Sequence, residues 1–421
     1  MKILIVTGYI DPVLTPNVKI ALNIANELIN LGNDVSIICL SHETISATQE
    51  FLGIKLSKIE DPNIRVKTKI DLLRKEKPEY KYLWIFLNFM RKFVHRASFT
   101  LRLNSLSTKI TLNYVDCIIS LDKKNDFDSI IATNAPYEAI YATYLVETKA
   151  KKIAFQLDRF VNGNSLYPFG KIDFIKKSMN KKIESACILN FDYWFYLKPL
   201  TQYFNKTYKQ MYLSKMQSLE HPLLENNFEK SNKNISDKIN IIYAGSFDKK
   251  LRNPTKLLQI FDLLIKNDNN IILDLYTFGN CEKIMSRATQ QNSNIRANNP
   301  ISNRDLKKEF NSSDFIIVVG NNSPDEVPSK VYEIIGYCKP IMHFYYNSND
   351  YYIELLSDYP VAVSINLNDN ISLNVQKIKS FIRYAKTMPD ISYDNISAKF
   401  IENSPAYVSK IIMDKLNEVS K

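Results

Sequence analysis

The chain has 421 residues, of which 45% are hydrophobic and 24% are charged, and it carries a formal net charge of +11. This length exceeds what one hydrophobic core normally serves, so we expect two globular domains. No apolar run approaches the roughly 20 residues of a membrane span, and the apolar N-terminus leads into no signal-peptide cleavage site. We therefore expect a cytoplasmic protein, either soluble or peripheral on the inner face of the membrane.

Five cysteines and four histidines lie scattered along the chain. The cysteines show no paired spacing and most of them sit in apolar segments, which is typical of reduced core residues. The histidines form no ligand-like pair, so we expect neither a structural nor a catalytic metal.

The first half of the chain alternates between predicted strands and helices. Residues 2–7 form an apolar run that ends at Gly8, residues 17–29 carry apolar side chains at helical spacing, and residues 34–40 form a second apolar run. This order predicts the start of a parallel sheet with right-handed crossovers. Two more strands are predicted at residues 129–133 and 152–157.

An acid follows each of these two later strands, Glu138 after the first and Asp158 after the second. Open α/β sheets bind their ligands beyond the carboxyl ends of the strands, so both acids are candidates for contacting a substrate hydroxyl. Asp158 is the better candidate for a polar contact at the reacting centre. A helix-capping or ion-paired aspartate is an equally good interpretation of it.

Residues 65–109 form a segment that is both basic and aromatic. It holds twelve Lys and Arg against three acids, a local net charge of +9. Its aromatic residues are Tyr80, Tyr82, Trp84, Phe86, Phe89, Phe93 and Phe99. This composition favours contact with an anionic membrane surface. The alternative is a solvated helix that packs its aromatic side chains on the core. No nucleic-acid-binding motif accompanies the charge, so we expect no nucleic-acid partner.

The strand and helix pattern restarts after a polar tract. Residues 225–237 are rich in Asn, Lys and Ser, which predicts an interdomain linker. Strands are then predicted at residues 240–244, 271–277 and 315–319, and a helix at 254–265. We therefore expect a first domain over residues 1–224, a second over 238–397, and a final helix over 398–421.

The stretch over residues 325–333 contains two acids, Asp325 and Glu333, and a predicted helix start near Ser329. The free N–H groups and the dipole of a helix start attract anions such as phosphate. Glu333, one turn inside the helix, is placed to accept hydrogen bonds from the vicinal hydroxyls of a sugar or ribose. An ordinary amphipathic helix capped by Ser329 is the alternative.

These residues resemble the donor-binding signature of retaining GT-B glycosyltransferases, in which two acids are separated by seven residues. The run from Pro328 to Glu333 is similar to the variant found in bacterial polysaccharide glycosyltransferases of the family 4 type. The resemblance implies two Rossmann-like domains facing across a cleft, with the C-terminal helix crossing back to the first. It also implies a UDP- or GDP-sugar as co-substrate, with no cofactor. The implied donor contacts are Asp325, Val327, Pro328, Ser329, Lys330 and Glu333.

The resemblance assigns two further groups of donor residues. Gly245 and Ser246 are implied donor contacts. Arg252 and Lys256, on the loop that follows them, look like the cationic pair that stabilises the departing diphosphate. Lys249 or Lys250 can replace one member of this pair, and a solvated loop is the alternative. The loop over residues 298–301, which ends at Ile301 before a helix capped by Ser302, occupies the place where relatives hold the nucleotide base.

The first domain departs from the family pattern, because no Gly-Gly loop follows its first strand and no histidine follows a suitable strand. We expect it to bind the acceptor through Asp158 and Glu138. The expected activity is metal-independent, retaining transfer of a sugar to a growing, lipid-linked bacterial surface glycan. A non-catalytic GT-B scaffold or partner subunit and a sugar-nucleotide epimerase of the same fold remain open.

Overall fold

The computed structural model describes residues 1–10, 15–41, 48–51, 53–161, 173–229, 238–322 and 329–418. The chain forms two compact units. Unit 1 comprises Met1–Pro222 and Pro405–Lys421, and unit 2 comprises Leu223–Ser404. The domain boundaries that we predicted from the sequence, after residue 224 and before residue 398, stay predictions. No helix in the described ranges is long and apolar enough to cross a membrane.

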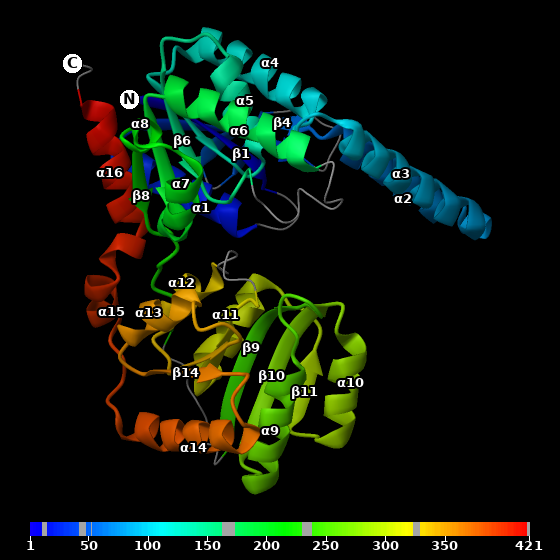
Figure 1. The fold of residues 1–421 in the computed structure, drawn as a ribbon, viewed down its shortest axis with the longest axis vertical. Helices are drawn as coiled ribbons and strands as arrows, with labels where there is room; N and C mark the ends of the chain where they lie inside the picture. Colours follow the sequence, from blue (N-terminus) through cyan, green and yellow to red (C-terminus); the bar gives the residue numbers. More distant parts are fainter. Residues whose placement is uncertain are drawn as a thin grey trace. The chain divides into compact units, whose positions relative to one another are not determined.

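Unit 1 is built on an eight-stranded sheet with the order β3-β4-β2-β1-β5-β6-β7-β8. Figure 1 shows this sheet with helices such as α4, α5 and α6 packed around it. The strands are β1 (Lys2–Tyr9), β2 (Asp34–Ser41), β3 (Thr48–Phe51), β4 (Ile54–Glu60), β5 (Ser129–Thr133), β6 (Lys151–Gln156), β7 (Tyr193–Leu197) and β8 (Met216–Leu219). All neighbouring strands pair in parallel except β3 and β4. The central strands β1 and β5 are almost wholly buried, as expected for a parallel sheet covered on both faces.

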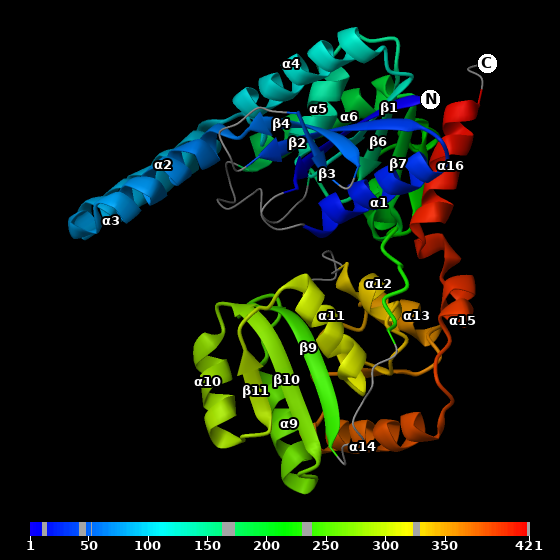
Figure 2. The ribbon, with the colours of Figure 1, turned by 180° about the vertical axis from the view of Figure 1, so that it is seen from behind.

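The helices of unit 1 include the first and the last helix of the chain. They are α1 (Pro16–Asn30), α2 (Pro62–Glu76), α3 (Lys81–Leu101), α4 (Thr108–Asn125), α5 (Tyr137–Leu145), α6 (Asp173–Asn190), α7 (Thr201–Thr207), α8 (Gln210–Leu213) and α16 (Pro405–Asn417). Helix α16 packs against α1 (Figure 2), which confirms that the C-terminal helix returns to the first unit. The single helix expected over residues 398–421 is wrong. Helix α15 (Tyr393–Lys399) ends first, a 3₁₀ turn follows, and Pro405 starts a new helix, as proline favours.

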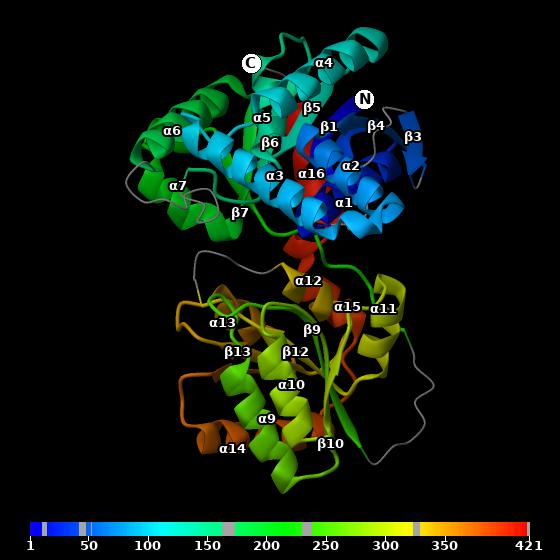
Figure 3. The ribbon, with the colours of Figure 1, turned by 90° about the vertical axis from the view of Figure 1, so that its right-hand side faces the viewer.

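Unit 2 is built on a six-stranded, wholly parallel sheet with the order β11-β10-β9-β12-β13-β14. Its strands are β9 (Ile239–Phe247), β10 (Ile271–Gly279), β11 (Ile295–Asn298), β12 (Phe315–Val319), β13 (Ile341–Tyr345) and β14 (Ala362–Asn366). Its helices are α9 (Thr255–Asn267), α10 (Glu282–Gln291), α11 (Asn303–Ser312), α12 (Lys330–Ile335), α13 (Tyr351–Ser357), α14 (Ile371–Thr387) and α15. Figure 3 shows α9 and α10 lying side by side.

The α/β class and the two Rossmann-like sheets are thus confirmed, with one shift in the strand ends. We predicted strands over residues 240–244 and 271–277, but β9 runs three residues further, to Phe247, and β10 runs two residues further, to Gly279. They continue because the two strands stay paired in register to their last residues. Gly245 and Ser246 therefore lie within a strand.

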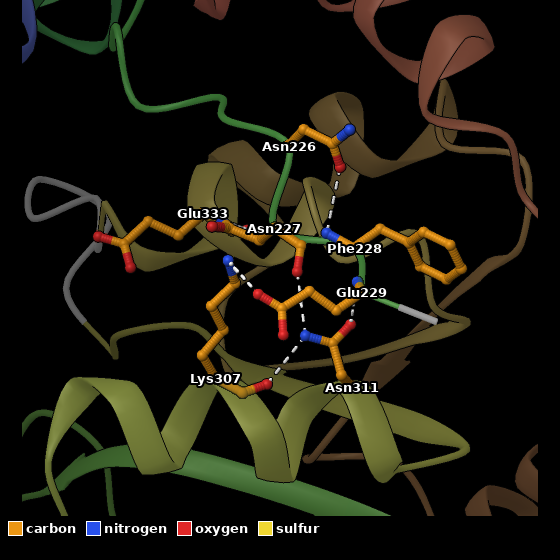
Figure 4. Close-up of polar contacts among 7 residues, drawn as sticks. All are labelled: Asn226, Asn227, Phe228, Glu229, Lys307, Asn311 and Glu333. Carbon is orange, nitrogen blue, oxygen red and sulfur yellow. Dashed lines mark hydrogen bonds and ion pairs between the residues drawn. The ribbon is translucent and has the colours of Figure 1, made fainter. Parts of the chain in front are cut away.

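The chain enters unit 2 through a short segment that is bonded to α11 and to the end of α12 (Figure 4). The Asn227 N–H donates to Gly336 O at 3.0 Å, and the Glu229 N–H donates to Asn311 Oδ1 at 2.8 Å. The Glu229 carboxylate also pairs with Lys307 Nζ at 2.8 Å. The first five residues of the predicted linker, 225–229, are thus part of the folded surface of unit 2.

Candidate functional site

The switch point of the unit 2 sheet lies between β9 and β12, where the chain order reverses. In doubly wound sheets the crevice outside the carboxyl ends of such strands is where ligands bind. Three sets of predicted donor residues, at residues 245–256, 298–301 and 329–333, lie in the last residues of strands of this sheet or after them. The topology alone therefore brings them to one edge of unit 2.

A pocket of about 750 Å³ opens at the carboxyl ends of β10 and β11. Its lining includes Phe247, Phe278 and Gly279, together with Asn298, Asn299 and Pro300. Gly279 has φ +127°, and a Cβ there would lie 2.0 Å from Phe247 O, so only glycine lets β9 and β10 approach so closely. The predicted base-binding loop is thus part of this pocket. Ile301 follows it, 38% exposed, and the Ser302 Oγ caps α11 as expected by accepting from the Asp305 N–H.

Arg252 lies at the switch point, on a tight loop that follows β9. The loop is closed by two hydrogen bonds between the backbones of Asp248 and Arg252, at 3.1 and 2.9 Å. The guanidinium donates from Nη2 to Asn321 Oδ1 at 2.8 Å and from Nη1 to Ser246 O at 3.3 Å. Because Asn321 follows β12, this side chain connects the two strands that flank the switch point. Its Nε is buried and makes no hydrogen bond within the described ranges.

Gly245 leaves room for this arrangement. A Cβ at residue 245 would lie 2.8 Å from the Tyr243 hydroxyl and 3.7 Å from Arg252 Nη1. The Tyr243 hydroxyl in turn donates to Ser246 O at 3.1 Å. Burial raises the pKa of Tyr243, although Arg252 lowers it, so the hydroxyl is neutral at neutral pH. Of the predicted donor residues, Ser246 therefore accepts a hydrogen bond from the guanidinium through its backbone carbonyl, and Gly245 leaves room for the Arg252 side chain.

The Arg252 loop and the pocket are joined through Asn280. Its side chain donates to Asp248 Oδ2 at 2.7 Å and accepts from the Lys249 N–H at 2.9 Å. Asp248 Oδ1 also accepts from the N–H groups of Leu251 and Lys250, and these bonds lower the pKa of its carboxyl. The guanidinium and the pocket thus belong to one bonded assembly.

The other cations of this loop point elsewhere. Lys256 Nζ donates to Asn368 Oδ1 at 3.1 Å, beyond the end of β14, so its charge does not share partners with Arg252. The side chains of Lys249 and Lys250 are exposed. Arg252 is therefore the cation that the folded loop fixes. Which lysine is the second member of the cationic pair stays a prediction.

The helix expected near Ser329 forms, but it is only six residues long, Lys330–Ile335. Ser329 occupies the N-cap position, and its side chain makes no capping hydrogen bond to the described part of the chain. The Glu333 side chain is half-buried and points away from the Glu229 and Lys307 pair in Figure 4. Asp325, Val327 and Pro328 lie outside the described residues. Lys330 Nζ lies 5.6 Å from the centre of the Phe310 ring.

In unit 1 the two predicted acids have partners within the fold. Glu138 Oε1 accepts from the Ser107 N–H at 2.7 Å, and burial raises the pKa of its carboxyl. Asp158 Oδ2 accepts from Asn17 Nδ2 at 2.5 Å, and its backbone carbonyl accepts from Asn134 Nδ2 at 2.6 Å. Asp158 is exposed and Glu138 is buried, so only Asp158 is open to a ligand from solvent.

Sequence reasoning missed the residues that support these sites. Asn321, which fixes Arg252, follows a strand that ends at a glycine, and that position was the available signal. The pocket residues Phe247 and Phe278 carried no signal, because they come together only through the register of β9 and β10. No three potential metal ligands of the His, Cys, Asp or Glu type lie together in the described part of the chain.

No protein-family model matches the chain, and the search of curated proteins gives no sequence match. Solved structures match it over its full length. A sucrose-phosphate synthase from Thermosynechococcus elongatus gives a TM-score of 0.63 at 10% identity and covers 100% of both chains. A glycosyltransferase from Rickettsia africae gives 0.60 at 14% identity and covers 99% of this chain and 98% of that one. A UDP-GlcNAc 2-epimerase from Neisseria meningitidis gives 0.56 at 12% identity and covers 100% of both.

These matches show that the chain has the fold of the GT-B glycosyltransferases. At identities of 10 to 14% they show the fold alone, since the matched proteins include both transferases and an epimerase. Activity has to be argued from the site.

Proposed function

We propose that the protein is a glycosyltransferase that takes a sugar from a nucleotide-diphosphate donor held by unit 2. The observation that carries the proposal is the assembly of a pocket and a fixed guanidinium on one sheet edge. A concave pocket with aromatic walls and a few polar groups suits a nucleoside, and Arg252 suits a diphosphate. The linkage through Asn280 sets the two at a fixed spacing.

The donor is proposed to lie along this edge, with its base in the pocket and its diphosphate at Arg252. Its sugar then lies toward Glu333 and Asp325, which accept hydrogen bonds from sugar hydroxyls. Lys256, Ser329 and Lys330 supply further contacts. Cationic side chains stabilise charge on the departing diphosphate, so the proposed reaction is metal-independent.

Retention of configuration is part of the proposal. The acceptor oxygen bonds to the anomeric carbon on the face from which the diphosphate leaves. The acceptor proton passes to the leaving diphosphate oxygen, so no strong general base is required. Asp158, exposed at the edge of unit 1, contacts the acceptor hydroxyl in this scheme, whereas the buried Glu138 acts by holding the loop at Ser107. The proposed acceptor is a lipid-linked bacterial surface glycan met at the cytoplasmic face of the membrane.

The donor site is tested by Glu333→Ala. Loss of hydrogen bonds from sugar hydroxyls to a carboxylate is expected to weaken the binding of UDP- or GDP-sugars about 10- to 100-fold, measured by calorimetry. Glu354→Ala, an exposed acid on α13, is the matched control and should bind as wild type does. Wild-type affinity in Glu333→Ala would remove Glu333 from the donor site.

An epimerase is the second candidate, because Asp158 offers an exposed carboxylate for moving a proton on the sugar. The two activities separate when nucleotide-sugars are incubated without acceptor and followed by NMR. An epimerase inverts one sugar carbon, whereas a transferase leaves the sugar intact until an acceptor is added. A scaffold protein would neither epimerise a donor nor release nucleoside diphosphate when acceptor is present.

A further inference from the structure

The basic-aromatic segment forms a helical hairpin that projects from unit 1 (Figures 1 and 2). Helices α2 and α3 pack against each other and are joined by a 3₁₀ turn, Pro78–Tyr80. Trp84 is 6% exposed and its Nε1 donates to Lys77 O at 2.7 Å, which fixes the turn. At about 1.5 Å per residue, the 21 residues of α3 extend about 30 Å.

Helix α3 has two different faces. Trp84, Leu87, Asn88 and Arg91 recur at spacings of three and four residues and are buried or half-buried. The opposite face carries Tyr82, Ile85, Phe86, Phe89 and Phe93, which are between 56% and 85% exposed. We name its four aromatic residues, Tyr82, Phe86, Phe89 and Phe93, the aromatic stripe. The interpretation that the aromatic side chains of this segment pack on the core is therefore wrong for the stripe.

The hairpin is strongly basic as well as apolar. Between Pro62 and Leu101 the chain has ten Lys and Arg against three acids. Lys75 in the last turn of α2, Lys77 just after it and Lys81 at the start of α3 are exposed around the 3₁₀ turn that forms the tip of the hairpin. Exposed aromatic residues flanked by lysines are the composition of helices that lie in the headgroup region of a bilayer.

Both roots of the hairpin are bonded to the carboxyl edge of the unit 1 sheet. Before α2, Asp61 accepts from the hydroxyl of Tyr9, the last residue of β1. After α3, the Ser107 N–H donates to Glu138, and the Ser105 N–H donates to Asn180 at 2.9 Å. Lys176 Nζ also donates to Phe99 O at 2.6 Å. The hairpin is thus held to the edge at which Asp158 lies.

We propose that the α2–α3 hairpin binds an anionic phospholipid bilayer, with the aromatic stripe entering the headgroup region and the tip lysines contacting lipid phosphates. The occupant is argued from charge, since a second copy would bring two strongly basic hairpins together, whereas an anionic surface attracts each one. The inference rests on the proposed function in one respect. A membrane-bound hairpin holds the acceptor edge of unit 1 near a lipid-linked substrate.

The test is cosedimentation of the full chain with vesicles of phosphatidylcholine alone or mixed with phosphatidylglycerol. Wild type should bind the anionic vesicles far more strongly, and less so as salt is raised. The apolar variant Phe86→Ser/Phe89→Ser/Phe93→Ser should bind them about 100-fold more weakly. The charge variant Lys75→Gln/Lys77→Gln/Lys81→Gln should also bind anionic vesicles about 100-fold more weakly, and its binding should depend much less on salt.

Matched controls remove exposed groups elsewhere on unit 1. Leu112→Ser/Leu145→Ser/Met211→Ser and Lys123→Gln/Lys124→Gln/Lys209→Gln should bind anionic vesicles as wild type does. Unchanged binding by both hairpin variants would overturn the proposal. A fall in molecular mass by analytical ultracentrifugation, with vesicle binding unchanged, would instead make the stripe an interface between copies.

The proposed function is checked separately by calorimetry with nucleotide-sugars. Hairpin variants should keep wild-type donor affinity, because the stripe lies in unit 1 and the pocket in unit 2. Vesicle binding in a protein that binds no nucleotide-sugar would support the hairpin inference and contradict the transferase. Binding of nucleotide-sugars without hairpin-dependent vesicle binding would support the proposed donor site and contradict the hairpin inference.

Discussion

The carboxyl edges of the two sheets differ in what they leave open. In unit 2 the edge keeps a pocket of about 750 Å³ beside a guanidinium whose buried Nε has no hydrogen-bond partner among the described residues. In unit 1 several polar groups at the corresponding edge bond to one another. Tyr9 bonds Asp61, Glu138 bonds Ser107, and Gln156 bonds Glu184.

This difference has a physical reason. A nucleotide is bound best by a preformed concave surface, because the protein then loses little conformational entropy on binding. Unit 1 instead uses buried acids to hold loops and the roots of the hairpin, which stabilises the fold. We therefore expect substitutions at the unit 2 edge to change donor binding and turnover, and substitutions among the buried acids of unit 1 to change stability.

The largest expected effect is that of Arg252→Ala on turnover. A fixed cation that stabilises the leaving diphosphate acts mainly in the transition state, so kcat should fall about 100- to 1000-fold. The rate at which nucleoside diphosphate is released measures kcat. Arg252→Lys should recover part of the rate, because a lysine keeps the charge but not the bidentate geometry. Arg304→Ala changes an exposed arginine on α11 and should leave kcat unchanged. An equal loss of kcat in Arg252→Ala and Arg304→Ala would contradict a specific role for the carboxyl edge of unit 2.

Blocking the pocket should have the next largest effect. Ala297 is exposed in the lining of the pocket, so Ala297→Trp should leave the fold intact and fill space that the base requires. Donor affinity is expected to fall at least about 10-fold, as a filled site loses the apolar contacts of the base. Ala398→Trp, at an exposed position on α15, is the control. Full donor affinity in Ala297→Trp would place the base outside this pocket.

Sequence reasoning predicted more of the fold than of the site, for identifiable reasons. The strand over residues 315–319 was predicted to the residue, because an apolar run ends at a glycine there. Gly245 misled the same rule, since a glycine in an extended strand can simply make space for Tyr243 and Arg252. Arg252 was found from its loop, but Phe247 and Phe278 come together only through strand register and carried no local signal.

The hairpin shows a second limit of sequence patterns. The spacing of Tyr82, Phe86, Phe89 and Phe93 predicts one apolar face of a helix, but it does not say whether that face is covered. A core helix and a membrane-surface helix give the same period. Only the exposed fractions in the folded chain separate the two.

The smallest expected effect, on stability alone, comes from Glu184 in unit 1. This buried carboxyl accepts hydrogen bonds from the hydroxyls of Tyr203 and Tyr208 and from Gln156 Nε2 at 2.7 Å. Burial raises the pKa of the carboxyl, and the three hydrogen bonds offset part of that rise. The folded state therefore holds the proton more tightly than the unfolded state, whose glutamate pKa is about 4.3.

The sign of the pH dependence follows from this difference. The contribution of Glu184 to the free energy of unfolding is fully present below pH about 4.3 and is lost as the pH rises through the raised pKa. Glu184→Gln cannot ionise, so its stability relative to wild type should improve from pH 4.5 to pH 7.5. Urea unfolding followed by tryptophan fluorescence measures it, since Trp84 and Trp194 are the only two tryptophans and both lie in unit 1. Parallel pH profiles, or a loss of donor affinity in Glu184→Gln, would contradict a purely structural role for this edge.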